Sequence, residues 1–163
     1  MTQSDRIEDL FEIINDLEIG MLVSENGNEL RSRPMKAFVD QKALNIWFLT
    51  KTASAKVQEI TKDQDVNISF ACPKTQNYVS VSGRANLSRD QAKIDEMWSD
   101  KMSVWFNCDK TDPTVSAICV TPSIAEYWDG ESNAVKRTWE VLKAKATDTK
   151  PDLGDNEKVR LAG

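Results

Sequence analysis

A group of hydroxyl and cationic side chains in the first third of the chain has the residue types and spacing to bind an anion. Thr50 and Ser54 lead into a segment with helical spacing that carries Lys56 in its first turn. The first turn of a helix presents unpaired N–H groups and the positive end of the helix dipole, and both favour a bound phosphate. Arg31 and Arg33 add cationic groups one strand earlier. The pattern predicts an anion site, although the commonest role of such residues is ordinary surface charge.

The chain contains no histidine, and this absence excludes several kinds of active site. Ser-His-Asp and Cys-His catalysis, zinc sites that use histidine and haem held by histidine all need an imidazole. Neither a Walker loop nor a G-x-G-x-x-G motif is present. The acidic residues form no compact group with metal-binding spacing. We therefore predict no metal site and no catalytic side chain, so that any chemistry would come from a cofactor.

Composition places the chain among ordinary globular proteins. Its 163 residues suit one domain, with 40% apolar and 29% charged residues. The net charge of -5 argues against a nucleic-acid surface, and no apolar run approaches the roughly 20 residues that span a bilayer. The polar, acidic start predicts no secretory signal. Three cysteines without a C-x-x-C spacing favour a reduced, cytoplasmic protein.

The predicted elements around the anion site are two strands and a helix. Residues 30–39 alternate with period two, so that Arg31 and Arg33 extend a face whose other half is apolar. Pro34 lacks an N–H for a strand ladder and indicates a sheet edge or a bulge. The segment 44–50 is apolar almost throughout and predicts a strand covered on both faces. A helix after Ser54 would then turn Val57 and Ile60 inward.

The remaining patterns predict further strands with helices inserted between them. Asp5 with Glu8 is read as the start of a first helix over about 5–18, and Ser88-x-x-Gln91 as a capping box. Further strands are predicted at 19–24, 66–72, 78–87, 115–120 and 124–128, with helical spacing at 133–146 and a small strand near 159–161. This order favours a mainly β protein with six or more antiparallel strands in a barrel. We expect one domain over 1–163, with the barrel at about 19–130 and a C-terminal helix and tail at about 131–163.

Several motifs in this order resemble a known family. They are Arg33-Pro34-Met35, Trp47-Phe48-Leu49-Thr50, Ser54-x-Lys56, the strand from Tyr78 to Ala85, and Glu126-Tyr127-Trp128. Together they are similar to the FMN-binding split barrels of the pyridoxamine 5'-phosphate oxidase-like superfamily, and within it to the bacterial general stress protein 26 family. The resemblance covers roughly residues 5–130. It implies a split β-barrel that binds FMN.

The resemblance also implies which residues hold the cofactor. Ser54 and Lys56 match family positions that bind the FMN phosphate, and Arg33 is expected to join them. The positions that line the flavin ring with backbone and side chains are Pro34, Met35, Phe48, Leu49 and Thr50. Family members are homodimers with the cofactor at the subunit interface. Tyr78, Trp105 and Trp128 are therefore candidates to contact the flavin of a partner subunit.

The resemblance implies a flavin-dependent oxidoreductase that exchanges electrons with a small-molecule donor or acceptor during stress. The alternative is a non-catalytic flavin-binding or flavin-sequestering stress protein. A third reading, a barrel that has lost its cofactor, is disfavoured by the retention of Arg33, Ser54 and Lys56. The pyridoxamine phosphate oxidases of this superfamily recognise their substrate with an Arg-x-His motif. Because this chain has no histidine, we do not expect pyridoxamine phosphate oxidase activity. Deazaflavin and haem stay open as other occupants of the pocket.

Overall fold

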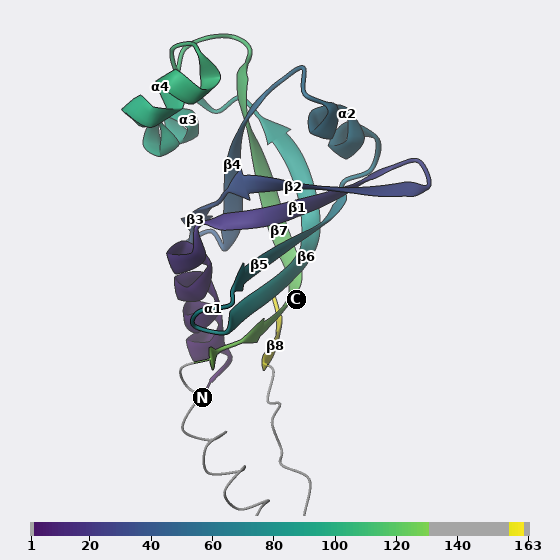
Figure 1. The fold of residues 1–163 in the computed structure, drawn as a ribbon, viewed down its shortest axis with the longest axis vertical. Helices are drawn as coiled ribbons and strands as arrows, with labels where there is room; N and C mark the ends of the chain where they lie inside the picture. Colours follow the sequence, from purple (N-terminus) through teal and green to yellow (C-terminus); the bar gives the residue numbers. More distant parts are fainter. Residues whose placement is uncertain (1, 131–156, 162–163) are drawn as a thin grey trace, which may run out of the picture.

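The computed structural model describes residues 2–130 and 157–161, and within these ranges eight strands form one antiparallel sheet (Figure 1). The strands are β1 (Ile19–Asn26), β2 (Glu29–Lys36), β3 (Phe38–Asp40), β4 (Asn45–Lys51), β5 (Asp65–Cys72), β6 (Asn77–Ser88), β7 (Val115–Trp128) and β8 (Glu157–Arg160). The helices are α1 (Gln3–Leu17), α2 (Ala55–Lys62), α3 (Gln91–Met97) and α4 (Asp100–Phe106). The predicted C-terminal helix lies in 131–156, outside the described residues.

Strand order closes this sheet into a barrel. The hydrogen-bonded order is β2-β1-β5-β6-β7-β4-β3, and β8 pairs with β7 beside this path. The strands at the two ends of the order, β2 and β3, are consecutive in the chain and are joined only by Ala37. The N–H of Ala37 donates to the Glu18 carbonyl at 2.7 Å, which ties the junction to the start of β1. The predicted mainly β barrel with six or more antiparallel strands is therefore confirmed.

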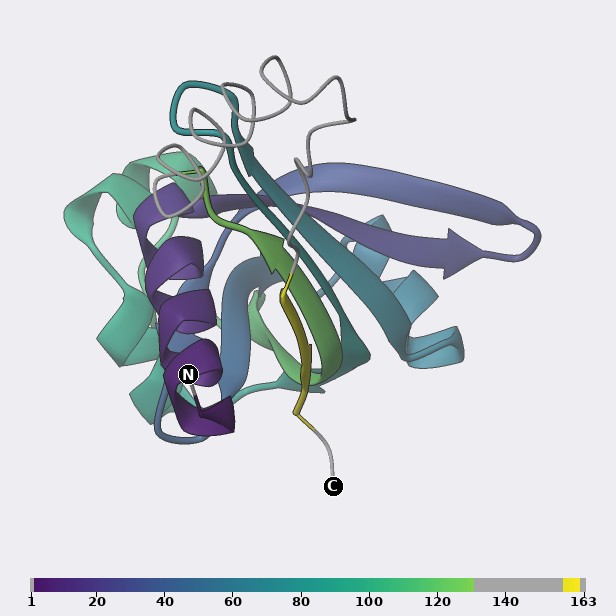
Figure 2. The ribbon, with the colours of Figure 1, turned by 90° about the horizontal axis from the view of Figure 1, so that it is seen from below.

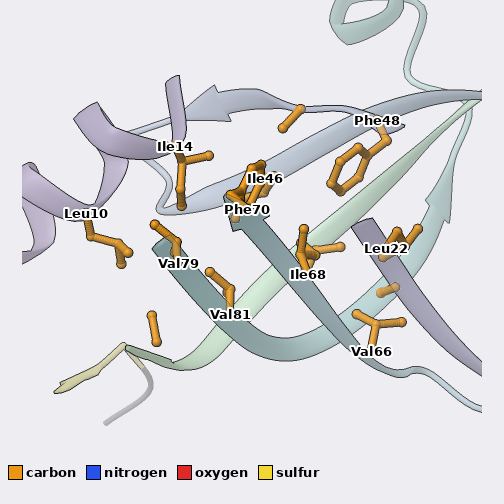
Figure 3. Close-up of a cluster of buried hydrophobic side chains, with 14 of the residues drawn as sticks. Leu10, Ile14, Leu22, Ile46, Phe48, Val66, Ile68, Phe70, Val79 and Val81 are labelled. Atoms are coloured by element: carbon orange, nitrogen blue, oxygen red, sulfur yellow. The ribbon is translucent and has the colours of Figure 1, made fainter. Parts of the chain in front are cut away.

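Alternating apolar residues of the strands build the core of the barrel. Ile46 and Phe48 of β4 meet Ile68 of β5 and Val81 of β6, and all four are fully buried (Figure 3). Full burial of each such side chain contributes about 1.5–3 kcal/mol. Helix α1 packs against β3, β5, β6 and β8 and adds Leu10 to the same cluster (Figures 2 and 3). The other three helices lie toward the opposite end of the barrel (Figure 1).

Two helix starts differ from the sequence prediction. Helix α1 is capped by Thr2 and not by Asp5, because Asp5 occupies the third helical position of a capping box that begins at Thr2. The Thr2 hydroxyl accepts from the Asp5 amide at 3.2 Å, and the Asp5 carboxylate accepts from the Thr2 amide at 2.7 Å. Helix α3 is capped by Asp90 instead of Ser88. The Asp90 carboxylate accepts from two amides of the first turn, which a hydroxyl two residues earlier does not reach.

A single long strand replaces the two strands predicted around Pro122. β7 runs unbroken from Val115 to Trp128. Pro122 falls where β7 leaves β4, whose pairing ends at Val120, and joins β8, whose pairing starts at Ile124, so its missing N–H breaks neither ladder. Opposite Pro122, the register of β6 shifts at Gly83. A Cβ at Gly83 would lie 2.3 Å from the Thr121 carbonyl oxygen, so the predicted bulge or close backbone approach at this glycine is confirmed.

Candidate functional site

An apolar cavity of about 350 Å³ lies between β2, β4 and α4. Three of the residues predicted to hold a flavin ring line it: Pro34 and Met35 from β2, and Leu49 from β4. The opposite wall comes from α4 and includes Met102, Trp105 and Phe106. The Trp105 side chain is 85% exposed, which is usual for a charged residue but unusual for a tryptophan. The cavity therefore has a mainly apolar lining and includes one highly exposed aromatic side chain, Trp105.

Phe48 and Thr50 point away from this cavity. Neighbouring residues on a strand face opposite sides, and Leu49 takes the cavity side. Phe48 is fully buried in the barrel core, as Figure 3 shows. Thr50 is buried as well, with its hydroxyl 3.2 Å from the Ser54 hydroxyl. Of Phe48 and Thr50, therefore, only the backbone atoms can contact a ligand in the cavity.

The start of α2 holds the groups predicted to bind a phosphate. Ser54 is the N-cap residue, and its side chain makes no hydrogen bond to the helix amides. Within the described ranges, the amides of Ala55 and Lys56 have no acceptor. Lys56 is half-buried, and burial lowers the pKa of its ammonium group; the nearby Arg33 guanidinium lowers it further, against an opposing effect of Glu59. Hydroxyl, amides and ammonium are the groups that a phosphate requires.

Arg33 pairs with a buried carboxylate that the sequence analysis missed. Glu59 of α2 is 4% exposed, and its Oε2 accepts from Arg33 Nη2 at 2.7 Å and from the Ser24 hydroxyl at 2.5 Å. Arg31 lies farther away, with Nη1 3.6 Å from Glu59 Oε1. Burial by itself would raise the pKa of Glu59, but the hydrogen bonds from Ser24 and Arg33 outweigh it and hold that pKa below its ordinary value. Glu59 is therefore an ionised carboxylate inside the fold.

Two features of the sequence could have predicted that Glu59 pairs with the arginines of β2. Glu59 directly precedes the inward-facing Ile60, and a charged residue at such a position needs a partner of opposite charge. The only strand before it with two cationic residues on its inner face is the one carrying Arg31 and Arg33. It was harder to predict that α4 forms a wall of the cavity, because its aromatic residues are equally typical of a helix that packs against the protein core.

The other candidate groups lie apart from the anion site. Tyr78 and Trp128 are paired across β6 and β7. In the described part of the chain no group of three or more histidine, cysteine or acidic residues could hold a metal ion. No helix described here is long and apolar enough to cross a membrane. The three cysteines, Cys72, Cys108 and Cys119, are free and half-buried.

Comparisons with known proteins return one consistent group. A family model described as pyridoxamine 5'-phosphate oxidase like matches residues 5–152. General stress protein 26 of Bacillus subtilis is 27% identical over 125 residues, which cover 75% of this chain and 87% of that protein. A crystal structure from Jannaschia sp. CCS1, described as general stress protein 26, superposes with a TM-score of 0.77 at 25% identity, over 96% of this chain and 99% of that one. The general stress FMN/FAD binding protein of Xanthomonas citri superposes with a TM-score of 0.68 at 22% identity, over 77% and 89%.

Proposed function

This chain belongs to the pyridoxamine 5'-phosphate oxidase-like family, and we propose that it is an FMN-binding protein of the general stress type. The observation that carries the proposal is the position of β4. Leu49 lines the apolar cavity, while the next residue, Thr50, contacts Ser54 at the start of α2. An apolar slot for a ring and the groups for a phosphate therefore lie on the two faces of the same end of β4, one residue apart in the sequence. FMN needs both environments.

In this proposal each predicted residue has a defined role. Ser54, Lys56 and the first amides of α2 bind the phosphate, and Arg33 adds donors from β2. Pro34, Met35 and Leu49 cover the ring with apolar surface, and the backbone of Phe48 and Thr50 offers hydrogen bonds to the ring edge. When bound, FMN supplies the electron-transfer chemistry, and the protein supplies orientation and surroundings.

We propose further that the protein is a homodimer with the cofactor at the subunit interface. Trp105 of α4 lines the cavity and is 85% exposed, and its neighbour Val104 is 83% exposed; a second subunit would cover both. The role that we favour is a cytoplasmic oxidoreductase acting on a small molecule; the three free thiols are consistent with that compartment. The alternative is a flavin-binding stress protein without turnover. Consumption of NADH or NADPH no faster than with free FMN would favour the alternative.

The test of FMN binding is an absorption spectrum of the purified protein followed by titration with FMN and riboflavin. We expect a retained flavin band near one FMN per chain. Lys56→Met should raise the Kd for FMN about tenfold or more, because a hydrogen bond to a charged group contributes about 1.5–3 kcal/mol. Riboflavin, which lacks the phosphate, should bind both proteins alike.

Lys62→Met is the matched control, because Lys62 lies on the same helix and is exposed at its far end. It removes the same charge and should change the Kd for FMN less than about twofold, as expected for screened surface charges. A folded protein that binds no FMN would overturn the proposal. Equal losses from the two lysine variants would show a general effect of charge and no phosphate site at Lys56.

A further inference from the structure

We propose that Glu59 and Ser24 are positioning residues that grip one end of the Arg33 guanidinium and leave its Nε–Nη2 edge to receive a phosphate. The inference rests on the proposed FMN site and adds to it two residues that no family motif in this chain includes. It explains why a carboxylate is buried beside a site for an anion, where its charge alone would oppose binding.

The hydrogen bonds of Arg33 show which end is held. Nη1 donates to the Leu22 carbonyl at 3.3 Å and to the Ser24 hydroxyl at 2.5 Å, which accounts for both of its hydrogens. Nη2 donates to Glu59 Oε2 at 2.7 Å. The Ser24 hydroxyl in turn donates to the same Glu59 oxygen at 2.5 Å, so Ser24 and Glu59 lie together against the Nη1–Nη2 end.

Covalent geometry then identifies the donors that are left. A guanidinium carries five N–H groups in one plane, and three of them are occupied. The two others, Nε–H and the second Nη2–H, point in parallel along one edge. No acceptor for either is found among the described residues. The Arg33 side chain keeps 21% of its surface exposed, so an incoming ligand can reach it. Two parallel N–H groups match the oxygens of a phosphate in a bidentate contact.

The charges of the cluster agree with a phosphate monoester as the ligand. Lys56 and Arg33 are close enough that the guanidinium lowers the pKa of the ammonium group. One carboxylate, Glu59, lies near three cationic groups, those of Arg31, Arg33 and Lys56, so the cluster has a net charge of +2. A phosphate monoester carries about −1.5 to −2 charges at neutral pH. Its binding would neutralise the repulsion between Lys56 and Arg33.

A positioning role and a purely electrostatic role predict opposite signs. If Glu59 acted only as a negative charge near the site, Glu59→Gln would strengthen FMN binding. If Glu59 holds Arg33 in place, the same variant frees the guanidinium, and FMN binding weakens because ordering the side chain again costs free energy. Glutamine keeps the size of the side chain and one acceptor oxygen, so the packing of α2 changes little.

The experiment measures Kd for FMN and for riboflavin with wild type, Glu59→Gln, Ser24→Ala and the control Glu25→Gln. Glu25 is an exposed neighbour of Ser24 and loses the same charge. We expect Glu59→Gln to raise the Kd for FMN about tenfold, the lower end of what hydrogen bonds to charged groups contribute. Ser24→Ala, which keeps every charge, should raise it about threefold, since Arg33 loses the hydroxyl that accepts from Nη1 but keeps Glu59. Riboflavin binding should change less than twofold in all variants, and Glu25→Gln should behave as wild type.

Coupling to Arg33 separates positioning from general damage to the fold. Arg33→Lys keeps the charge but loses the bidentate edge, and Glu59→Gln added to it should cause no further loss for FMN. Unchanged or stronger FMN binding by Glu59→Gln, or losses that add in the double variant, would overturn the inference. If Glu59→Gln does not fold, Ser24→Ala tests the inference instead, and an unchanged Kd for FMN in that variant would overturn it. A folded wild type that binds neither flavin refutes the proposed function itself, whereas preserved FMN preference in the variants refutes only the positioning role.

Discussion

Removing the Arg33 guanidinium should destabilise the protein even without any ligand, because the buried Glu59 loses its shortest ion pair and keeps only the longer contact to Arg31 and the more remote Lys56. We consider Arg33→Met, which keeps most of the side-chain volume and removes the charge. Breaking a buried ion pair by removing one partner costs about 3–5 kcal/mol. Arg33 keeps 21% of its side-chain surface exposed, and Arg31 stays 3.6 Å from the other carboxylate oxygen. Both facts favour the lower end, about 3 kcal/mol.

The pH dependence of this loss follows from the pKa of Glu59. In the native protein that pKa lies below its ordinary value of 4.5, so the stabilisation from the ionised carboxylate is fully present above about pH 4.5. It is lost as the pH falls through the native pKa. Protonation also removes the unpaired charge from the variant. The difference between wild type and Arg33→Met should therefore be largest near neutral pH and should shrink under acid conditions.

Urea unfolding at neutral and acid pH measures this difference, without flavin and at one protein concentration, since any oligomer would make stability depend on concentration. Arg31→Met is the matched control: its side chain is 51% exposed, and exposed ion pairs contribute at most about 1 kcal/mol. Adding Glu59→Gln to Arg33→Met should recover at least half of the loss. A loss below about 1 kcal/mol, or the same loss at both pH values, would refute a buried and ionised Glu59.

Two further predictions concern the barrel. Gly83→Ala should cost about 3 kcal/mol in urea unfolding, since its Cβ would meet the Thr121 carbonyl oxygen at 2.3 Å and overpacking against backbone is not relieved by a rotamer change; a loss under about 0.5 kcal/mol would contradict the close approach. The Tyr127 hydroxyl is buried without a hydrogen-bond partner among the described residues, and burial, with Asp9 and Glu157 nearby, raises its pKa to about 12. Tyr127→Phe should therefore leave stability unchanged or raise it by up to about 1 kcal/mol, and should abolish a tyrosinate absorbance step near pH 12; a step well below that pH in wild type would show that the hydroxyl is accessible. Because the pKa is raised above 10, wild-type stability should fall as the pH rises beyond 10.

The barrel and the family could be predicted from sequence because their signals are local. The alternation that predicted a strand from residue 30 depends only on the period of a strand, and the turn between β1 and β2 needs only a residue that accepts a positive φ, which is +67° at Gly27. The predicted resemblance to the pyridoxamine phosphate oxidase-like superfamily is confirmed. The roles of Arg33, Ser54 and Lys56 at a flavin phosphate stay predictions.

Helix caps and strand breaks were harder to predict from the sequence. Asp5 and Ser88 carry good capping side chains, but so do their neighbours Thr2 and Asp90, and the choice depends on where packing lets the first turn begin. Pro122 suggested a break because proline interrupts a ladder. Only the exchange of partners from β4 to β8 shows that Pro122 needs no bond to either of these strands.

By itself the amino-acid sequence determined the strand periods and the hydroxyl–lysine start of α2, which depend on residues a few positions apart, and the absence of imidazole chemistry, which depends on composition alone. Tertiary structure alone decided that Glu59 meets Arg33 from 26 positions away and that α4 closes a cavity on Pro34 and Leu49. These contacts form between segments that are distant in the chain. Their geometry follows from barrel closure, which no local pattern encodes.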